Sequence, residues 1–388
     1  MTLNRGLSLA FVFLFACSRP TGPDAGPPPD GGLGIETCGV DVHQHFAHNS
    51  SFDVGASSMI EGMEAVGYAH SLVMPPPIAD PGTAPEGAAN WIYTERSRDG
   101  GPSLLETVQA DPEHFSLVAG GGILNRWIHG AVVSGIEPDE ADLYAFERAA
   151  EDILDDGAVG FGEMAALHLS IEATHPFIMI PADHAYFLRL AEVAGRRGVP
   201  IDIHAEMVDG VTIAIPDDLP RNALGRSCFR STANETNPGN NPVEIADMMV
   251  GFERLLAHDP SAAIIWSHVG WDNIGHMTTE RLRELMNAYP NLYLSLKMLD
   301  DPSPGCQLIA NRPLDPTDGS LRPEWEALIE DFAERVVIGA DTFFGDPSTE
   351  PASVAAPNTR GTWALVDRLA PETATMVACE NPRRLFGL

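Results

Sequence analysis

Eight short apolar runs rich in Val and Ile, each followed by a stretch with helical spacing, constrain the fold more than any other feature of the sequence. We expect strands at 39–46, 70–75, 115–123, 158–165, 199–205, 262–269, 292–298 and 336–341. We expect helices at 56–66, 103–111, 139–156, 184–198, 244–258, 278–289, 323–334 and 360–370. Eight strand–helix pairs predict a parallel α/β architecture, a (β/α)8 TIM-type barrel forming a single catalytic domain. Alternation alone does not exclude a doubly wound sheet.

The beginning of the chain differs in composition from the rest. Arg5 followed by the apolar run 7–16 is typical of a secretory signal, because the run is too short to span a bilayer. The next segment is rich in Pro and Gly and has too few apolar side chains to pack, which predicts a disordered tether. We therefore expect a signal peptide at 1–17, a tether at 18–37 and a barrel at 38–388.

The signal segment ends in Leu14-Phe15-Ala16-Cys17, which resembles the lipobox of bacterial lipoproteins. The resemblance implies acylation of Cys17 and an N-terminal lipid anchor. Ser18 rather than Asp follows the cysteine, which implies the outer membrane, with the domain periplasmic or at the cell surface. An ordinary signal peptide with an incidental cysteine is the alternative.

The net charge narrows the possible partners. The sequence carries 55 acidic and 23 basic residues, for a formal net charge of -32. Such a charge repels polyanions and offers no release of counterions from phosphates, so we exclude nucleic acid as substrate or partner. We expect a small-molecule substrate, and the composition leaves the oligomeric state open.

The first expected strand contains a metal-ligand pattern, Asp41-Val42-His43-Gln44-His45. Alternate side chains of a strand point to the same face, so we expect Asp41, His43 and His45 to point one way. Neutral imidazole suits Zn²⁺ and its transition-metal neighbours. The two histidines could therefore hold one cation.

Four later strands also carry polar groups near their C-terminal ends. These groups are Glu163, His204, His268 and Asp341. Their neighbours on each strand are apolar or glycine, so we expect each polar group to be buried. A lone buried charge costs several kcal/mol unless a partner or a metal offsets it. Convergence of these groups at one barrel mouth predicts a metal site.

With these residues in place, the sequence resembles the amidohydrolase superfamily, within it the amidohydrolase-related (amidohydrolase 2) branch of metal-dependent TIM-barrel hydrolases. The resemblance covers 38–388 and includes the ending Asn381-Pro382-Arg383-Arg384-Leu385-Phe386. It implies that His43 and His45 bind a divalent metal, that His204 is a further ligand, and that Asp341 touches the metal and handles the proton. It implies that His268 is either a ligand of a second metal or a catalytic base.

Glu163 decides how many metals the site holds. Relatives with two metals use a carboxylated lysine or a glutamate on the fourth strand, whereas decarboxylase-like relatives generally have no ligand there. We interpret Glu163 as a metal ligand. We expect one or two divalent cations per chain, with Zn²⁺ as the first candidate. The alternative is that Glu163 pairs with Arg126 or with a ligand histidine.

The predicted activity is hydrolysis of a small amide, lactone or ester by metal-activated water, with Asp341 accepting and returning the proton. Two alternatives stay open: a non-oxidative decarboxylase of the same branch, and a non-catalytic surface lipoprotein stabilised by metal. Arg126, Trp271 and Lys297 are weaker candidates for substrate binding. Arg126 could equally form a surface salt bridge, and Trp271 could simply pack.

Four cysteines follow the signal segment, which suits an oxidising compartment. Cys38 and Cys379 fall at the N-terminal end of the predicted barrel, and Cys228 and Cys306 fall in loops at the opposite end. A disulfide cannot span the length of the strands. If bridges exist, we expect Cys38–Cys379 and Cys228–Cys306, with reduced, separately buried thiols as the alternative.

Overall fold

A computed structural model describes residues 34–47, 51–78, 92–97, 100–170, 176–215, 217–219, 229, 231–232, 240–298, 310–345 and 357–388. The predicted signal peptide, Cys17, Cys228 and Cys306 lie outside these residues. Within the described ranges, no helix combines the length and the apolar character needed to cross a membrane.

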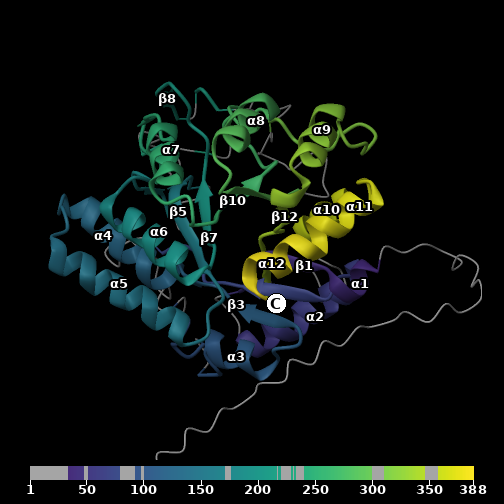
Figure 1. Ribbon diagram of the computed structural model, residues 1–388, viewed down its shortest axis with the longest axis horizontal. Coiled ribbons are helices and arrows are strands. Elements are labelled where there is room, and N and C mark those ends of the chain that lie inside the picture. The colour runs from purple at the N-terminus through teal and green to yellow at the C-terminus, as the bar shows by residue number, and fades with distance from the viewer. Residues whose placement is uncertain are drawn as a thin grey trace, which may run out of the picture. The chain divides into compact units, whose positions relative to one another are not determined.

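The parallel strands form two sheets, in the orders β13-β1-β2-β3 and β12-β11-β10-β7-β5-β4, and β3 leads into β4 as β12 leads into β13, so together they occupy eight positions around a barrel. Figure 1 shows the strands surrounded by helices. The strands are β1 Val40–Phe46, β2 His70–Val73, β3 Phe115–Leu117, β4 Ala119–Gly120, β5 Phe161–His168, β7 Ile201–Ala205, β10 Ile264–Val269, β11 Leu292–Leu296, β12 Val336–Ile338 and β13 Thr342–Phe344. β3 pairs with β2, and β4, two residues further on, pairs with β5. β12 pairs with β11, and β13 pairs with β1. The ring of neighbours is complete, so the predicted (β/α)8 barrel and single domain are confirmed.

Helices form the layer outside the strands. They are α1 Ile35–Cys38, α2 Phe52–Val66, α3 Leu104–Ala110, α4 Arg126–Ser134, α5 Glu140–Asp155, α6 Ala185–Arg197, α7 Met249–His258, α8 Thr279–Ala288, α9 Pro323–Asp331, α10 Pro357–Val366, α11 Pro371–Thr375 and α12 Asn381–Phe386. Ser103 begins α3 with a capping box that includes Glu106. α6 ends as its sequence predicts, with Gly198 in the left-handed region after two arginines.

The inside of the barrel is filled by a small apolar layer. Val40, Val42, Leu72, Met74, Val118, Ile265 and Val337 form it, and Phe386 of α12 packs against it. Most of these side chains come from β1, β2, β10 and β12 or from residues next to them. Because they are buried and in contact with one another, the inside of the barrel is a packed core rather than a channel. A larger apolar cluster packs the helices against the outside of the strands.

The prediction of a strand at 115–123 is wrong beyond Gly120. Gly121–Asn125 forms a single π-helical turn that leads directly into α4, a helix that we did not predict. The reason is steric, because a Cβ at Gly121 would lie 2.5 Å from the carbonyl oxygen of Glu163. Glycine therefore allows the chain to turn away at this point, close to β5.

Several other predicted boundaries also differ from the structure, among them the start of α2 at Phe52 and the end of α10 at Val366. The helix expected from 244 begins at Met249, because Glu244–Ile245 (β9) pairs with Ile213–Ala214 (β8). β5 runs on to His168 and pairs there with Ile178–Met179 (β6). The end of the predicted tether is also helical, since α1 begins at Ile35.

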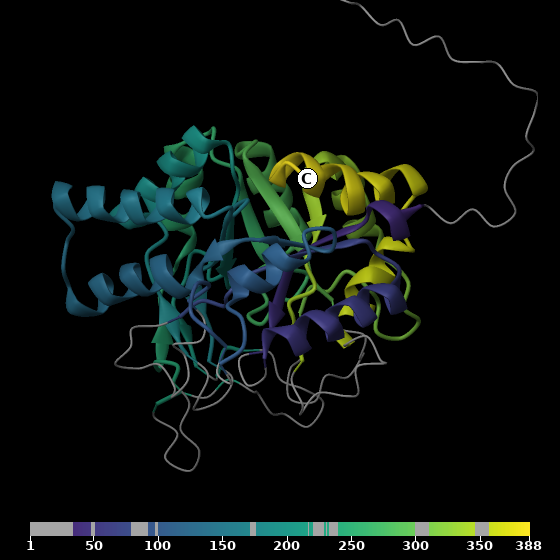
Figure 2. The ribbon, with the colours of Figure 1, turned by 90° about the horizontal axis from the view of Figure 1, so that it is seen from below.

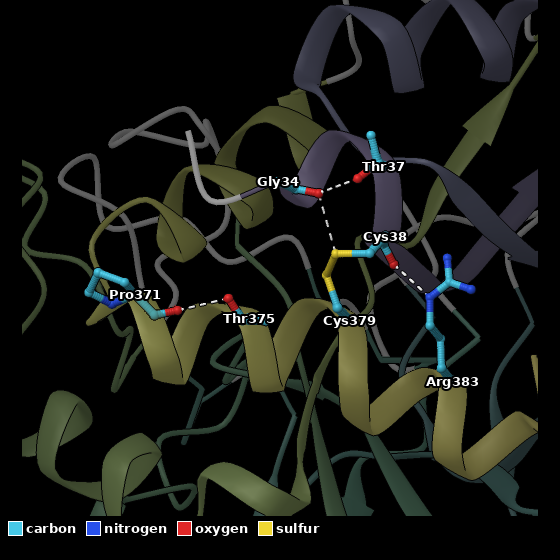
Figure 3. Close-up of a disulfide and its surroundings, with 7 residues drawn as sticks. All are labelled: Gly34, Thr37, Cys38, Pro371, Thr375, Cys379 and Arg383. Atoms are coloured by element: carbon cyan, nitrogen blue, oxygen red, sulfur yellow. Dashed lines mark hydrogen bonds between the residues drawn. A yellow bond between two sulfur atoms is a disulfide. The ribbon is translucent and has the colours of Figure 1, made fainter. Parts of the chain in front are cut away.

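A disulfide between Cys38 and Cys379 joins α1 to the π-helical turn Met376–Glu380 (Figure 3). The two Cα atoms are 5.3 Å apart, and the pair closes a loop with a sequence separation of 341. Arg383 of α12 donates from Nε to the carbonyl oxygen of Cys38 at 3.0 Å. Figure 2 shows the C-terminal helices beside α1. The predicted Cys38–Cys379 pairing is confirmed, and Cys228–Cys306 stays a prediction.

Candidate metal centre

The structure brings together all six predicted side chains at the C-terminal ends of the strands. They are His43 and His45 of β1, Glu163 of β5, His204 of β7, His268 of β10 and Asp341 at the junction of β12 with β13. The four histidine rings lie close together. The ring centroids of His43 and His45 are 5.0 Å apart, and those of His204 and His268 are 4.5 Å apart. His204 and Asp341 are less buried than we expected, because their side chains keep 15% and 16% exposure.

Glu163 lies at the centre of this cluster. Its Oε2 is 3.5 Å from Nε2 of both His43 and His45. Its Oε1 is 2.8 Å from Nδ1 of His204 and 3.2 Å from Nε2 of His268. Each carboxylate oxygen thus faces one pair of histidines. The two sets, His43–His45–Glu163 and Glu163–His204–His268, each have ligand atoms within 4.8 Å of one another.

Unpartnered ring nitrogens show that these residues fit a cation. His43 Nε2, His45 Nε2 and His268 Nδ1 are buried and make no hydrogen bond. The other nitrogens of the first two rings are held, since Nδ1 of His45 donates to the carbonyl oxygen of Met74 at 2.8 Å. Nδ1 of His43 lies 3.1 Å from Oδ1 of Asp202. This is how metal-ligating histidines are oriented in proteins, with the outer nitrogen fixed and the inner one free to bind.

The charges in the cluster also suit a cation. Burial alone would lower the pKa of His43, but Asp202 and Glu163 outweigh it and hold that pKa well above its usual value. Burial opposes ionisation of Glu163, yet the neighbouring histidines hold its pKa well below the usual range. Burial, helped by the Lys297 ammonium, lowers the pKa of His268 to about 3. Glu163 is therefore ionised and His268 neutral, both forms that bind metals, while the raised pKa of His43 reflects the surrounding carboxylates, whose negative charge a bound cation would offset.

The strand register shifts at His43, Glu163 and His268, and these shifts change the direction in which the three side chains point. The pairing of β1 with β2 shifts between Asp41 and Gln44, around His43. The pairing of β5 shifts around Glu163, and that of β10 shifts around His268, which also has a φ of 63°. A bulge lets a strand turn an extra side chain to one face, and bulges are common next to active sites.

Asp41 corrects one prediction, because it does not join the two histidines. The bulge after it breaks the alternation on which that expectation rested. Its Oδ2 accepts a hydrogen bond from Nε1 of Trp363 at 2.9 Å, and its Oδ1 accepts one from the backbone N–H of Ala340 at 3.1 Å. Burial raises the pKa of Asp41 to about 6 against these hydrogen bonds. Asp41 therefore ties β1 to α10 and β12.

Asp341 is held on both carboxylate oxygens. Oδ1 lies 3.1 Å from Nε2 of His45, and Oδ2 accepts a hydrogen bond from Nζ of Lys297 at 2.5 Å. The φ of Asp341 is 51°, a strained value for a residue other than glycine. Burial would raise the pKa of Asp341, but Lys297 and the nearby histidines hold it well below its usual value. Asp341 is thus an ionised group beside the metal ligands.

Sequence reasoning did not assign a role to Asp202 or Glu206 of the same segment. Asp202 is buried, and its Oδ1 accepts a hydrogen bond from Ser267 at 2.6 Å in addition to contacting His43. Glu206 is buried beside His204, with Oε1 3.6 Å from that residue's Nε2. The signal was available, because 202, 204 and 206 share one face of a strand.

The three predicted substrate-binding residues lie in different places. Lys297 contacts Asp341, and its Nζ lies 4.5 Å from the ring centroid of Trp271, so these two residues adjoin the cluster. Arg126 instead begins α4 and lines a surface cavity together with Trp127 and Tyr186. No contact between Arg126 and Glu163 is seen within the described residues.

Comparison with known proteins defines the class. The family model described as Amidohydrolase matches residues 40–388, and the chain belongs to this family. A search of curated proteins gives no match. The family and the histidine–carboxylate cluster together imply a divalent metal ion.

Several solved structures are similar to this chain. One is 2,6-dihydroxybenzoate decarboxylase in complex with 2,6-dihydroxybenzoate, at 16% identity and a TM-score of 0.46, covering 90% of this chain and 99% of that chain. A Staphylococcus aureus protein assigned to the amidohydrolases has 15% identity and a TM-score of 0.45, covering 90% and 99%. A D-aminoacylase mutant has 14% identity and a TM-score of 0.46, covering 90% and 74%. Since these TM-scores are below 0.5, membership rests on the family model.

Proposed function

We propose that this protein is a metal-dependent hydrolase that acts on a small amide, lactone or ester. The observation that carries the proposal is the position of Glu163, whose two oxygens face two separate pairs of histidines. A shared carboxylate offsets the repulsion between two cations, so this arrangement supports two metal ions per chain. The nitrogen and oxygen donors suit Zn²⁺.

His43 and His45 would hold one cation with Glu163, and His204 and His268 would hold the other. A divalent metal bound there lowers the pKa of water and polarises a substrate carbonyl. The protein holds the first two rings buried and oriented, because Asp202 and the carbonyl oxygen of Met74 fix their outer nitrogens. These contacts select the ring nitrogens that face the cluster.

Asp341 is the group placed to move protons. It is ionised, it lies beside His45, and its side chain keeps some exposure toward the strand ends. An ionised carboxylate there can take a proton from the attacking water and return it to the leaving group. Lys297 and Trp271 wall the same side of the site.

The test combines metal analysis with activity. We expect about two metal ions per purified chain, and turnover of at least one member of a panel of amides, lactones and esters. The variant Glu163→Gln should lose the second ion and most of the turnover. His114→Asn is the matched control, because His114 forms its ion pair with Asp111 and lines a cavity that contains none of the cluster.

Two outcomes would contradict the proposal. One metal ion per chain, with release of CO2 from a carboxylated substrate and no hydrolysis, would establish the decarboxylase alternative. Full metal content without turnover of any substrate in either assay would favour a metal-stabilised surface protein.

We also propose that the protein is exported and anchored through Cys17. The Cys38–Cys379 disulfide supports export, because disulfides persist in oxidising compartments. The lipobox-like sequence supports the anchor. Metabolic labelling with a fatty acid should mark the wild type in the membrane fraction and leave Cys17→Ser unlabelled. Label that persists in Cys17→Ser would place the acyl group elsewhere.

A further inference from the structure

Lys297 is the only lysine in the 388-residue sequence, although the chain has 23 Lys and Arg residues in all. Arginine serves every other basic position, including the surface ion pairs on α6 and α8. The single lysine lies instead just after β11, where it is 7% exposed and adjoins the metal ligands. A residue type used once, and used here, points to a requirement for its particular chemistry.

Lysine and arginine differ in the shape of their charge. The ammonium group is compact and donates from a single point, whereas guanidinium is a planar fork that suits bidentate contacts. Nζ of Lys297 contacts one oxygen of Asp341 at 2.5 Å and lies over the ring of Trp271 at 4.5 Å from its centroid. A single-point donor fits this narrow place between a carboxylate and a ring.

The backbone of Asp341 is fixed by hydrogen bonds that do not involve Lys297. Its N–H donates to the carbonyl oxygen of His43 at 2.8 Å, and its own carbonyl oxygen accepts from Asn358 at 3.0 Å. Oδ1 of the carboxylate lies 3.1 Å from Nε2 of His45, whereas Oδ2 accepts the hydrogen bond from Lys297 and lies 3.7 Å from Nδ1 of His268. Neither of these two ring nitrogens makes a hydrogen bond, so Lys297 is the described side chain that donates to the carboxylate of Asp341 and defines where Oδ2 points.

We propose that Lys297 is a positioning residue that holds Oδ2 of Asp341 so that the carboxylate faces the metal ligands. The proposal rests on the role given to Asp341 in the proposed function. Trp271 keeps the ammonium in place through its ring face, a cation–π contact. Lys297 acts through Asp341 and does not itself touch the reacting atoms.

The single lysine allows a direct test without any substrate. Protein grown with lysine labelled at Nζ with ¹⁵N gives one side-chain signal, because no other lysine exists in the sequence. We expect this signal to move in Asp341→Asn and in Trp271→Leu, and to stay in Arg283→Met. Arg283 is the matched control, since it forms an exposed ion pair with Asp331 between α8 and α9. A signal that does not move in Asp341→Asn would overturn the proposal.

Kinetics supply the second readout. In Lys297→Met the Asp341 carboxylate loses a charge-assisted hydrogen bond, so we expect kcat to fall roughly 10- to 100-fold. KM and the metal content should stay unchanged. In Lys297→Ala, added ethylammonium should restore part of kcat, whereas tetramethylammonium, which has no N–H, should not.

The outcomes separate this proposal from the proposed function. An increase in KM with an unchanged kcat would make Lys297 a substrate-binding residue and overturn positioning. Rescue by tetramethylammonium as well as by ethylammonium would show that charge alone suffices, which also contradicts it. If the enzyme proves not to be a hydrolase, the NMR measurement still tests the contact with Asp341.

Discussion

The two ends of the barrel treat buried histidines in opposite ways. At the C-terminal end, His43, His45 and His268 each leave one ring nitrogen without a hydrogen bond. At the N-terminal end, His70 begins β2 and uses both nitrogens, with Nδ1 donating to the carbonyl oxygen of Glu113 and Nε2 accepting from Ser116, each at 2.9 Å. All four histidines are buried, so the bonding partners distinguish a ligand site from a structural one.

A cavity at the other end of the barrel differs from the metal centre in its bonding. A cavity of about 670 Å³ opens at the N-terminal end and is lined by His70, His114, Tyr68 and Arg383, among others. Among its described lining residues, no buried side-chain nitrogen or oxygen lacks a hydrogen bond. The metal centre is recognised by unsatisfied polar atoms, which cost free energy unless a ligand joins them.

The largest expected effect is the loss of metal binding at the C-terminal end of the barrel. His43→Ala combined with His45→Ala should abolish metal binding in the first set and all activity, because both free nitrogens are lost. His70→Ala, at the other end, should keep its metal. The measurement is metal content per chain by mass spectrometry. Full occupancy in the double variant would refute the assignment of these ligands.

The next effect separates metal binding from proton transfer. Asp341→Asn should keep metal at both sets, since neither set requires Asp341. Turnover should fall by roughly 10²- to 10⁴-fold, the usual contribution of a general acid–base group. Steady-state kinetics on the folded, metal-loaded variant decide the matter. Near-normal turnover would mean that another residue moves the proton.

The third effect belongs to the N-terminal end and concerns stability. Replacing both Cys38 and Cys379 by Ser opens a loop with a sequence separation of 341. The chain-entropy model assigns such a closure about 6 kcal/mol of unfolding free energy, an upper figure because strain in the native state subtracts from it. Denaturant unfolding should show this loss, while metal content and turnover stay as in the wild type. A loss of metal in this variant would show that the two ends are coupled.

The smallest effect is a pH dependence at His70. Burial lowers the pKa of His70 below 6.5, so the unfolded chain binds the proton more readily than the folded one. The stability contribution of neutral His70 is therefore complete above pH 6.5 and is lost as the pH falls toward the folded-state pKa. In His70→Gln, the unfolding free energy should depend less on pH between 6.5 and the folded-state pKa of His70. We expect the difference from the wild type over this pH range to be about 1 kcal/mol or less. An unchanged pH profile would exclude His70 as the cause.

Much of this arrangement follows from the sequence. Strand–helix alternation gives the barrel, and polar residues at strand ends give the metal site, because the C-terminal ends of parallel strands meet. The pairing of Cys38 with Cys379 follows from the same reasoning, since only cysteines at one end of a barrel come within disulfide range.

The failures come from backbone irregularities that leave little trace in a single sequence. We predicted the wrong direction for the Asp41 side chain. A one-residue bulge between Asp41 and Gln44 turns the residues of β1 before it to the opposite face. The helix α4 was missed because its start follows three glycines, which read as a strand end or a loop. The contact of Lys297 with Asp341 joins residues 44 positions apart in the sequence, each just after a strand, and local patterns do not reveal it.

The covalent loop has a mechanical consequence. Tension applied between Gly34 and Leu388 would run through Cys38, the sulfur–sulfur bond and Cys379, leaving everything between the two cysteines slack. β1 begins two residues after Cys38 and carries His43 and His45, so without the bond it would be the first strand to be peeled away. With the bond in place, a pull on the N-terminal side leaves the metal ligands in register.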